Sequence, residues 1–410
     1  MLRPTESPVL FLQQLGRGLR KATDKTSCTV LDFVGTHRRE FRFDRRYRAL
    51  LGGTRRGLER TVQQQFPFLP TGCSMQLDEQ AAAVVLRSLR EAIPSQWKAK
   101  VDELRSLRRA DPTIGLTEYL DETGLEIEDL YANNRSWSTL LVDAAQPVVS
   151  AGSREDALRR GIGRLLHVDD ATRLATYRAF VSGSAPVVER LSVREARLLQ
   201  MLGAALADQA LTKDTTLQGA VDLVWSHPQV LAELDEVFGL LEHRVDHLHQ
   251  PLVTHPDSPL EIHARYSRIE ILAAMGLGSE RAKVAPWQSG VYEAKEANAE
   301  LFAFTLDKST GGFSPTTRYR DYALSRTLIH WESQSATRAD SPTGLRYRHH
   351  ERDGRTILLF TRLRSDDRAF WFLGPARYRS HVGERPMAIT WELDVPLPGD
   401  LYAAFAAAVA

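Results

Sequence analysis

Cysteine is scarce in this sequence: among its 410 residues only Cys28 and Cys73 carry a thiol. Two cysteines are too few for a disulfide framework or for a zinc site made of cysteines, so the reducing cytoplasm is the expected compartment. Long apolar runs are also missing, because the longest fall well short of the roughly 20 residues that a membrane span requires. The amino terminus lacks the charged-then-apolar order of a signal peptide. We therefore expect a cytoplasmic protein without a membrane partner.

A phosphate-binding loop is a second absence. No segment reads Gly-x-x-x-x-Gly-Lys followed by Ser or Thr, which is the pattern whose backbone amides and lysine hold the phosphates of ATP. We therefore expect no cofactor in this chain and no ATP hydrolysis by the chain alone.

The charge of the chain is unevenly distributed, although the net charge is only +1. Residues 1–110 carry 21 basic side chains against 11 acidic ones, residues 111–250 carry 12 against 22, and the remainder carries 20 against 19. A basic first segment beside an acidic middle predicts either a nucleic-acid face or pairing of the two segments within the molecule.

The pattern of apolar residues divides the chain into parts. Residues 9–21, with Ser7 as the cap, have helical spacing, and the β-rich run 29–34 is typical of a buried strand. Two helices broken near Pro94 are expected over 77–109, and helices continue through 112–250. After one more helix at 266–275, strands are expected at 300–306, 327–334, 355–363, 369–373 and 387–393. We expect an α+β multidomain chain with parts at 1–60, 61–250 and 251–400 and a tail at 401–410.

An arginine-rich stretch lies in the basic segment. Residues 36–60 hold nine arginines, with Phe41, Phe43 and Tyr47 between them. Arginine forks suit phosphates and aromatic rings can stack on bases, so contact with nucleic acid is one interpretation. In the other interpretation the aromatic residues belong to a core and the arginines pair with the acidic middle. The residues leave both open.

The segment from Gln13 to Arg20 reads Gln-x-x-Gly-Arg-x-x-Arg and resembles the last motif of superfamily 2 helicases. The resemblance implies that Gln13 and Gly16 lie near the nucleotide cleft of a complete motor. It also implies that Arg17 and Arg20 are arginine-finger residues that face the nucleotide phosphates. Such a finger acts only on a phosphoryl group that is held elsewhere. Residues 1–60 would then be a remnant of the second RecA-like lobe.

Polar and aromatic residues crowd the loops expected in 251–400. An aromatic-lined cavity with one acidic group is what reading a flipped cytosine demands, since rings stack on the base and a carboxylate accepts from its amino group. The stacking candidates are Tyr292, Tyr322 and Trp331, the edge reader is Asp321, and the phosphate contacts are Arg318, Arg320 and Arg346. Tyr319 is a further DNA-binding candidate. The alternative is that the same aromatic residues fill the core and the polar residues cap turns.

Taken together, the motifs resemble the carboxy-terminal half of a family of bacterial defence proteins. That family joins a phospholipase-D-like nuclease, a superfamily 2 helicase and a carboxy-terminal domain of unknown function 3427. The segments that carry the resemblance are 13–20, 54–60, 66–73, 266–268, 290–292, 314–317, 330–335 and 372–375.

The resemblance implies a type IV, modification-dependent restriction system in which the carboxy-terminal domain is a mainly β, SRA/PUA-like reader. Double-stranded DNA that carries modified cytosine would be its partner, together with the missing helicase and nuclease portions, and ATP and Mg would serve the complete parent motor. The expected function is a DNA-binding module that reads modified cytosine by base flipping. The alternative is an incomplete helicase subunit whose arginine finger completes ATP hydrolysis in a partner or in the full-length parent.

Overall fold

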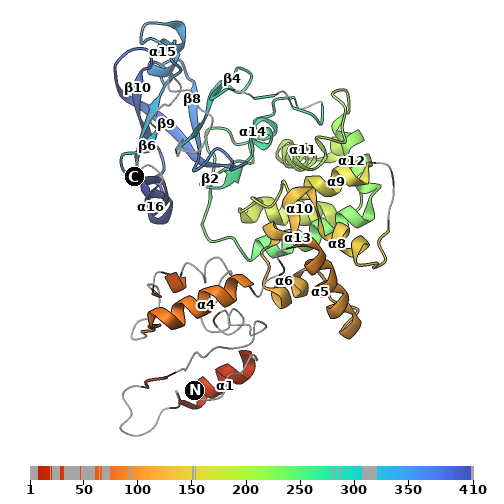
Figure 1. Ribbon diagram of the computed structural model, residues 1–410. Helices are drawn as coiled ribbons and strands as arrows, with labels where there is room; N and C mark the ends of the chain where they lie inside the picture. Colours follow the sequence, from red (N-terminus) through yellow and green to blue (C-terminus); the bar gives the residue numbers. More distant parts are fainter. Residues whose placement is uncertain are drawn as a thin grey trace. The chain divides into compact units, whose positions relative to one another are not determined.

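The computed structural model describes residues 8–18, 20, 28–31, 47, 61–63, 65–66, 74–91, 94, 96–149, 152, 154–278, 281–284, 286–287, 289–306 and 321–407. The chain divides into two compact units, Met1–Val148 and Val149–Ala410. Helices and strands occur together (Figure 1), which confirms the expected mixture of α and β structure. No helix in the described ranges is long and apolar enough to cross a bilayer.

The regular secondary structure described in the first unit is helical. Its elements are α1 (Pro8–Gly18), α4 (Glu79–Glu91), α5 (Trp97–Ala110), α6 (Leu116–Thr123), α7 (Ile127–Tyr131), the 3-10 turn η1 (Ala132–Asn134) and α8 (Trp137–Asp143). Pro94 separates α4 from α5 as expected, because proline lacks the N–H that a helix interior requires. Trp137 is almost fully buried and packs on Tyr119, whose hydroxyl donates a hydrogen bond of 2.9 Å to the Lys100 carbonyl oxygen.

One expected strand is wrong over its described part. Thr29, Val30 and Leu31 have no regular secondary structure and are exposed, Leu31 by 68%. Residues 32–34 lie outside the described residues. A β-rich run forms a strand only where another strand pairs with it, and every named strand of the described residues begins at Gln250 or later.

Of the arginine-rich stretch 36–60, only Tyr47 belongs to the described residues, and the expected cap Ser7 lies outside them as well. Tyr47 is buried and stacks on Phe66, with 6.3 Å between the ring centroids. Val62 and Val85 complete this small apolar cluster. Tyr47 therefore has the core position that one of the two interpretations expects, whereas the role of the arginines remains a prediction.

The second unit begins with a helical part. Its helices are α9 (Glu155–Ile162), α10 (Ala171–Ser182), η2 (Val188–Arg190), α11 (Val193–Ala207), α12 (Leu217–Trp225) and α13 (Pro228–Glu242). Helix α11 starts with a capping box in which Ser192 and Glu195 satisfy each other's backbone N–H groups. Gly161 lets α9 approach α11 closely, because a Cβ there would lie 1.8 Å from the Leu206 carbonyl oxygen.

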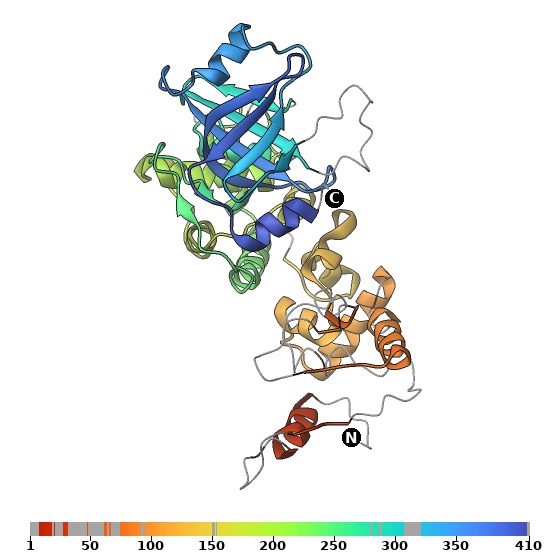
Figure 2. The same ribbon diagram turned by 90° about the vertical axis from the view of Figure 1, so that its left-hand side faces the viewer.

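A mixed sheet follows the helical part (Figure 2). Its strands are β3 (Arg265–Tyr266), β4 (Val291–Ala294), β5 (Ala299–Thr305), β6 (Tyr322–Ala323), β7 (Leu328–Glu332), β8 (Thr356–Arg362), β9 (Phe370–Val382) and β10 (Ala388–Leu393). The order is β4-β5-β8-β9-β10-β7-β6, β3 pairs with β9, and β5 and β8 run parallel. The strands β5, β7, β8, β9 and β10 agree with the expected ranges, although β9 extends nine residues beyond 373, to Val382.

Three short helices and a two-stranded pair accompany the sheet. They are α14 (Arg268–Ala274), α15 (Pro342–Arg348), α16 (Gly399–Ala407), β1 (Gln250–Pro251) and β2 (Glu261–Ile262). Both ribbon views place α15 and α16 at opposite ends of the sheet. The core of the sheet is aromatic: Phe302 lies 4.6 Å from Trp331, 5.0 Å from Tyr347 and 5.5 Å from Trp391, measured between ring centroids. Large rings packed in this way dominate the energetics of a core.

A buried network of charges connects the helical part to the sheet part. The guanidinium of Arg173 on α10 contacts Glu270 on α14 at 3.1 Å and Asp170 at 2.8 Å, and it donates to the Arg265 carbonyl oxygen on β3. His167 lies 2.6 Å from the same Glu270 carboxylate. Arg173 and Glu270 are 1% and 0% exposed. Both parts therefore belong to one compact unit.

Replacing Glu270 with glutamine should destabilise the second unit strongly. Burial alone would raise the pKa of the Glu270 carboxyl, but His167 and Arg173 lower the pKa to about 2. Removing this carboxylate leaves Arg173 paired with Asp170 and breaks one contact of a buried charge network, a change that typically costs up to about 3–5 kcal/mol of unfolding free energy. Urea unfolding of Glu270→Gln at neutral pH measures the loss. The same change at the exposed Glu189 is the matched control and should cost little.

The pH dependence has a defined sign. Because the folded-state pKa is depressed, ionised Glu270 stabilises the fold fully above the ordinary pKa of 4.5, and this contribution disappears as the pH falls toward 2. The unfolding free energy of Glu270→Gln should therefore depend less on pH than that of the natural chain over this interval. If the unfolding free energy of Glu270→Gln depended on pH as steeply as that of the natural chain, the stabilising role of the network would be contradicted.

Candidate functional site

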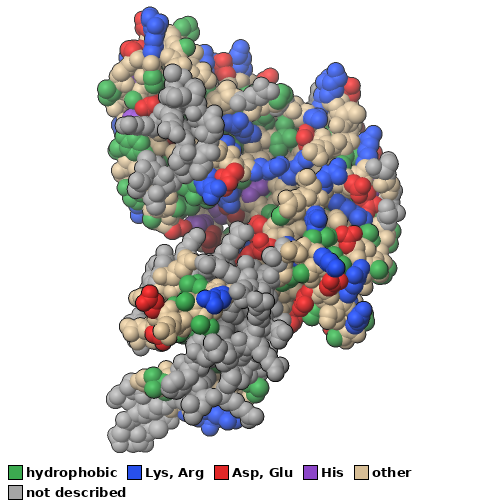
Figure 3. Space-filling model, viewed as in Figure 1, with side chains coloured by type: hydrophobic (Ala, Val, Ile, Leu, Met, Phe, Trp, Pro, Cys, Tyr) green, Lys and Arg blue, Asp and Glu red, His purple; other side chains and the backbone are tan. Residues whose placement is uncertain are grey.

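The second unit contains a cavity of about 470 Å³ where its helical part meets the sheet. Four arginines line it, namely Arg164, Arg268, Arg362 and Arg368, together with Ser267, Phe370 and residues of α11. In the space-filling view, basic side chains gather along the hollow between the sheet and the helices of this unit (Figure 3). A cavity of this size is large enough for a small ligand. We refer to it as the arginine cavity.

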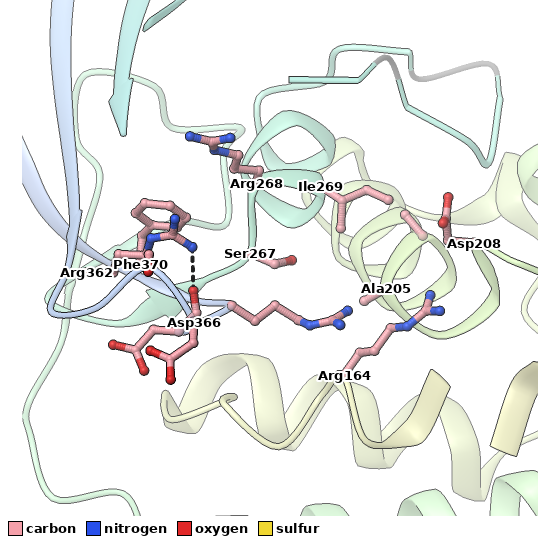
Figure 4. A pocket seen from close by; sticks show the side chains of 13 residues that line it. Arg164, Ala205, Asp208, Ser267, Arg268, Ile269, Arg362, Asp366 and Phe370 are labelled. Carbon is pink, nitrogen blue, oxygen red and sulfur yellow. Dashed lines mark hydrogen bonds between the residues drawn. The ribbon is translucent and has the colours of Figure 1, made fainter. Parts of the chain in front are cut away.

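The four arginines come from the ends of separate elements. Arg164 follows the end of α9, Arg268 is the first residue of α14, Arg362 is the last residue of β8, and Arg368 lies in the turn between β8 and β9. Figure 4 shows Arg164 extending from the helical part while Arg268 and Arg362 approach from the other side of the cavity. The ends of regular elements are free to project long side chains because the following backbone turns away.

Two of the guanidinium groups donate their hydrogen bonds to neutral groups, although for Arg362 attraction from Asp367 and Asp366 opposes the lowering of its pKa by burial. Arg362 donates to the Thr305 hydroxyl at 3.0 Å and to the Asp367 carbonyl oxygen at 2.6 Å, and its guanidinium lies 4.7 Å from the centre of the Phe370 ring. Arg268 donates to the Trp287 carbonyl oxygen and lies 5.4 Å from the same Phe370 ring. Cation–π contacts of this kind orient a guanidinium without neutralising its charge.

The other two arginines, Arg164 and Arg368, have no hydrogen-bond or ion-pair partner within the described parts of the chain. Burial lowers the pKa of the Arg164 side chain and repulsion from Arg368 lowers it further, while attraction from Asp208, which also lines the cavity, opposes both. Burial, followed by repulsion from Arg362, likewise lowers the pKa of Arg268. All four side chains nevertheless remain charged, because arginine does not lose its proton in proteins.

Three carboxylates also line the arginine cavity, but each has contacts of its own. Asp208 lies 3.5 Å from Lys283, and Asp366 is paired with Arg364 at 2.7 Å. The Asp367 carboxylate accepts the backbone N–H of Arg364 at 3.1 Å. Four arginines against three aspartates leave the lining with a net charge of +1, which a bound anion would neutralise. Among the described residues, no group of three or more His, Cys, Asp and Glu is arranged to hold a metal ion.

Trp331 and Tyr292, two predicted stacking residues, lie far apart in the sheet order. Trp331 on β7 is 5% exposed and packs against Phe302 and Tyr347 in the core. Tyr292 lies on β4, at the opposite end of the strand order, with its ring centroid 5.9 Å from that of Trp287. The structure thus gives Trp331 the core position that the alternative interpretation expects.

Asp321 and Tyr322 lie together at the other end of the sheet. The Tyr322 ring on β6 stacks on His330 of β7, with 4.5 Å between centroids. Asp321 is 3% exposed and accepts the backbone N–H of Glu332 at 3.0 Å. Trp331 is next to His330 in β7 and therefore points to the opposite face of the sheet. Arg318, Tyr319 and Arg320 lie outside the described residues.

Arg346, a predicted phosphate contact, is engaged in ion pairs. Its side chain on α15 contacts the buried Glu300 carboxylate at 2.8 Å and Glu293 at 3.8 Å. Arg355 contacts the same two carboxylates, at 3.6 Å and 3.1 Å. This cluster holds α15 against β4, β5 and β8.

The predicted helicase-motif residues lie in the first unit. Gln13, Gly16 and Arg17 are exposed on α1, which was expected over 9–21 and ends at Gly18. Arg20 is exposed beyond the end of the helix, so α1 alone does not place the two arginines on one face. Their assignment to a nucleotide cleft remains a prediction.

The sequence patterns did not identify the arginine cavity. Arg268 belongs to one of the segments that carried the resemblance, and Arg362 ends an expected strand, but neither position suggests a binding role by itself. Arg164 lies more than a hundred residues from Arg268. Only the packing of α9 and α14 against the β8–β9 connection brings these side chains together.

Comparison with known families adds one finding. Residues 260–405 match the family described as Domain of unknown function (DUF3427). The carboxy-terminal part of the chain is a DUF3427 domain. It supplies Arg268, Arg362, Arg368 and Phe370 to the arginine cavity, whereas Arg164 comes from the helical part that precedes the DUF3427 domain. No curated protein matches the chain.

Removing one of the repelling charges should stabilise the fold. Arg368 is exposed and its charge opposes that of Arg164, so Arg368→Ala should raise the unfolding free energy at low salt by about 0.5 kcal/mol. High salt should diminish the gain because it screens the repulsion. Urea unfolding at low and at high salt measures this gain in unfolding free energy. Arg352→Ala, which removes an exposed arginine paired with Asp353, should give no such gain; an equal gain in both variants would assign the effect to net charge alone.

Proposed function

We propose that this chain is a DNA-binding module of a modification-dependent restriction or helicase system and that it reads modified cytosine in duplex DNA. The arginine cavity is the observation that carries the proposal. It gathers Arg164, Arg268, Arg362 and Arg368 in one concave site. Arginine forks match phosphate oxygens in charge and geometry, and phosphates supply most of the affinity of proteins for DNA.

The arrangement of the arginines supports a binding role over a structural one. Arg173, which joins the two parts of the unit, has a carboxylate partner in Glu270. Arg164 and Arg368 have no such partner in the described ranges, and Arg368 is accessible to a ligand. Neighbouring like charges cost stability, and proteins keep such arrangements chiefly where a ligand uses them.

The base-reading part of the proposal is located at Tyr322 and His330. Their stacked rings are partly exposed on adjacent strands, and Asp321 precedes Tyr322 directly. A flipped cytosine requires a ring to stack on and a carboxylate to accept from its amino group. We assign stacking to Tyr322, with His330 supporting it, and the reading of the base edge to Asp321. Trp331, which packs in the core behind them, would hold β7 in place.

Methylated and plain duplexes distinguish base reading from general DNA binding. Using the full chain and 5′-phosphorylated duplexes, we expect about tenfold tighter binding when one cytosine carries a 5-methyl group, a difference of about 1.4 kcal/mol. Tyr322→Leu should abolish this preference and keep the affinity for plain duplex. Fluorescence anisotropy measures both affinities.

The control for this variant is Tyr378→Leu, the same change at a partly buried tyrosine on β9. It should keep the preference for the methylated duplex. Equal affinity of the natural chain for the two duplexes would reject base reading, and failure to bind either would reject DNA binding altogether.

A further inference from the structure

We propose that the arginine cavity binds a terminal phosphate, that is, a phosphomonoester at the end of a nucleotide, in preference to an internal phosphodiester of the DNA backbone. The site is the one that contacts phosphate in the proposed function, and the choice of a nucleotide as the carrier of the phosphate rests on that function. The class of ligand follows from the charge, the shape and the lining of the cavity.

Charge is the first argument. A phosphomonoester carries between about −1.5 and −2 at neutral pH and offers three acceptor oxygens, whereas an internal phosphodiester carries a single charge. The arginine cavity presents four guanidinium groups and three carboxylates, and among the described residues Arg164 and Arg368 have no hydrogen-bond or ion-pair partner. Arg164 and Arg368 repel each other, as do Arg268 and Arg362. A dianion between them relieves more of this repulsion than a monoanion does.

Shape and lining are the second argument. Segments from α9, α11, α14 and the β8–β9 connection surround a space of about 470 Å³, which suits one nucleotide. An internal phosphodiester has chain on both sides and carries further phosphates with it. The remaining lining includes the hydroxyls of Ser267 and Ser365, together with Ala204, Ala205 and Ile269, which can pack against a sugar.

Preorganisation is the third argument. Arg268 and Arg362 are both fixed over the ring of Phe370, and Arg362 is fixed further by its bonds to Thr305 and to the Asp367 carbonyl oxygen. Side chains that are already ordered lose little conformational entropy when a ligand binds. The two fixed guanidiniums would define the position of the phosphate, and Arg164 and Arg368 would close around its remaining oxygens.

Duplexes that differ only at their ends test the proposal. Three versions of one duplex are used with the full chain: one with 5′-phosphates, one with 5′-hydroxyls, and one whose ends are closed by hairpin loops. We expect the phosphorylated duplex to bind about tenfold more tightly than the other two, which corresponds to one or two additional charge-assisted hydrogen bonds. Deoxycytidine 5′-monophosphate should compete for the site, while deoxycytidine should not.

Three variants test whether the preference for the phosphorylated duplex arises from the arginine cavity. Arg368→Ala changes an exposed side chain and should remove most of the preference for the phosphorylated end. Arg164→Lys keeps the charge but loses the fork, so it should reduce the preference only in part. Arg352→Ala removes an exposed arginine that does not line the cavity and should leave the preference unchanged.

The outcomes separate this proposal from the proposed function. If all three duplexes bind equally and Arg368→Ala weakens each of them, the cavity holds an internal phosphate, and the terminal-phosphate proposal is overturned while DNA binding stands. If no duplex binds but the free nucleotide does, the phosphomonoester site stands and the DNA-reading function fails. If inorganic phosphate competes as well as the nucleotide, the nucleotide part of the ligand is not recognised, and the proposal is overturned in that respect.

Discussion

The ion pair between Arg173 and Glu270 is the interaction on which the second unit depends. Both groups are inside the protein, where a charge without a partner is very costly. The carboxylate must therefore lie against Arg173 and His167, and this requirement places α14 against α10 and against the loop that follows α9. Ser267 donates to the same carboxylate through its hydroxyl, so the first turn of α14 is fixed as well. The buried charges thus determine where the DUF3427 domain meets the helices before it.

The arginine cavity is a consequence of this junction. Arg164 lies three residues before His167, and Arg268 lies two residues before Glu270, so the network that joins the two parts also brings these arginines to one place. The sheet adds Arg362 and Arg368 from the end of β8 and the turn after it. In the network each positive charge has a carboxylate at close range, whereas in the cavity four arginines outnumber the three aspartates that line it. Charged residues that lie only a few positions apart in the sequence therefore have different roles. Those of the network stabilise the fold, and we assign those of the cavity to ligand binding.

Much of the secondary structure could be predicted, since it follows from local spacing. Apolar residues three and four apart indicated α9 to α13, and short apolar runs between turn residues indicated β5, β7, β8 and β10. The strand expected at 29–34 failed over its described part, because propensity cannot supply a pairing partner. The candidate site was less predictable. Trp331 was predicted as a stacking residue because it is a large aromatic residue beside polar neighbours. Side chains alternate between the two faces of a strand, so Trp331 points into the core while His330 faces Tyr322.

The sequence by itself determined the absence of a phosphate-binding loop, the order of helices and strands, and the segments that identify the DUF3427 domain at 260–405. These properties are local, since each depends on residues close together in the chain. Only the tertiary structure decided that Arg164, Arg268, Arg362 and Arg368 share a cavity and that Arg346 is neutralised by Glu300. An arginine looks the same in the sequence whether it meets a carboxylate or another arginine. Its partner is set by contacts between distant elements, and those contacts follow from the packing of the whole unit.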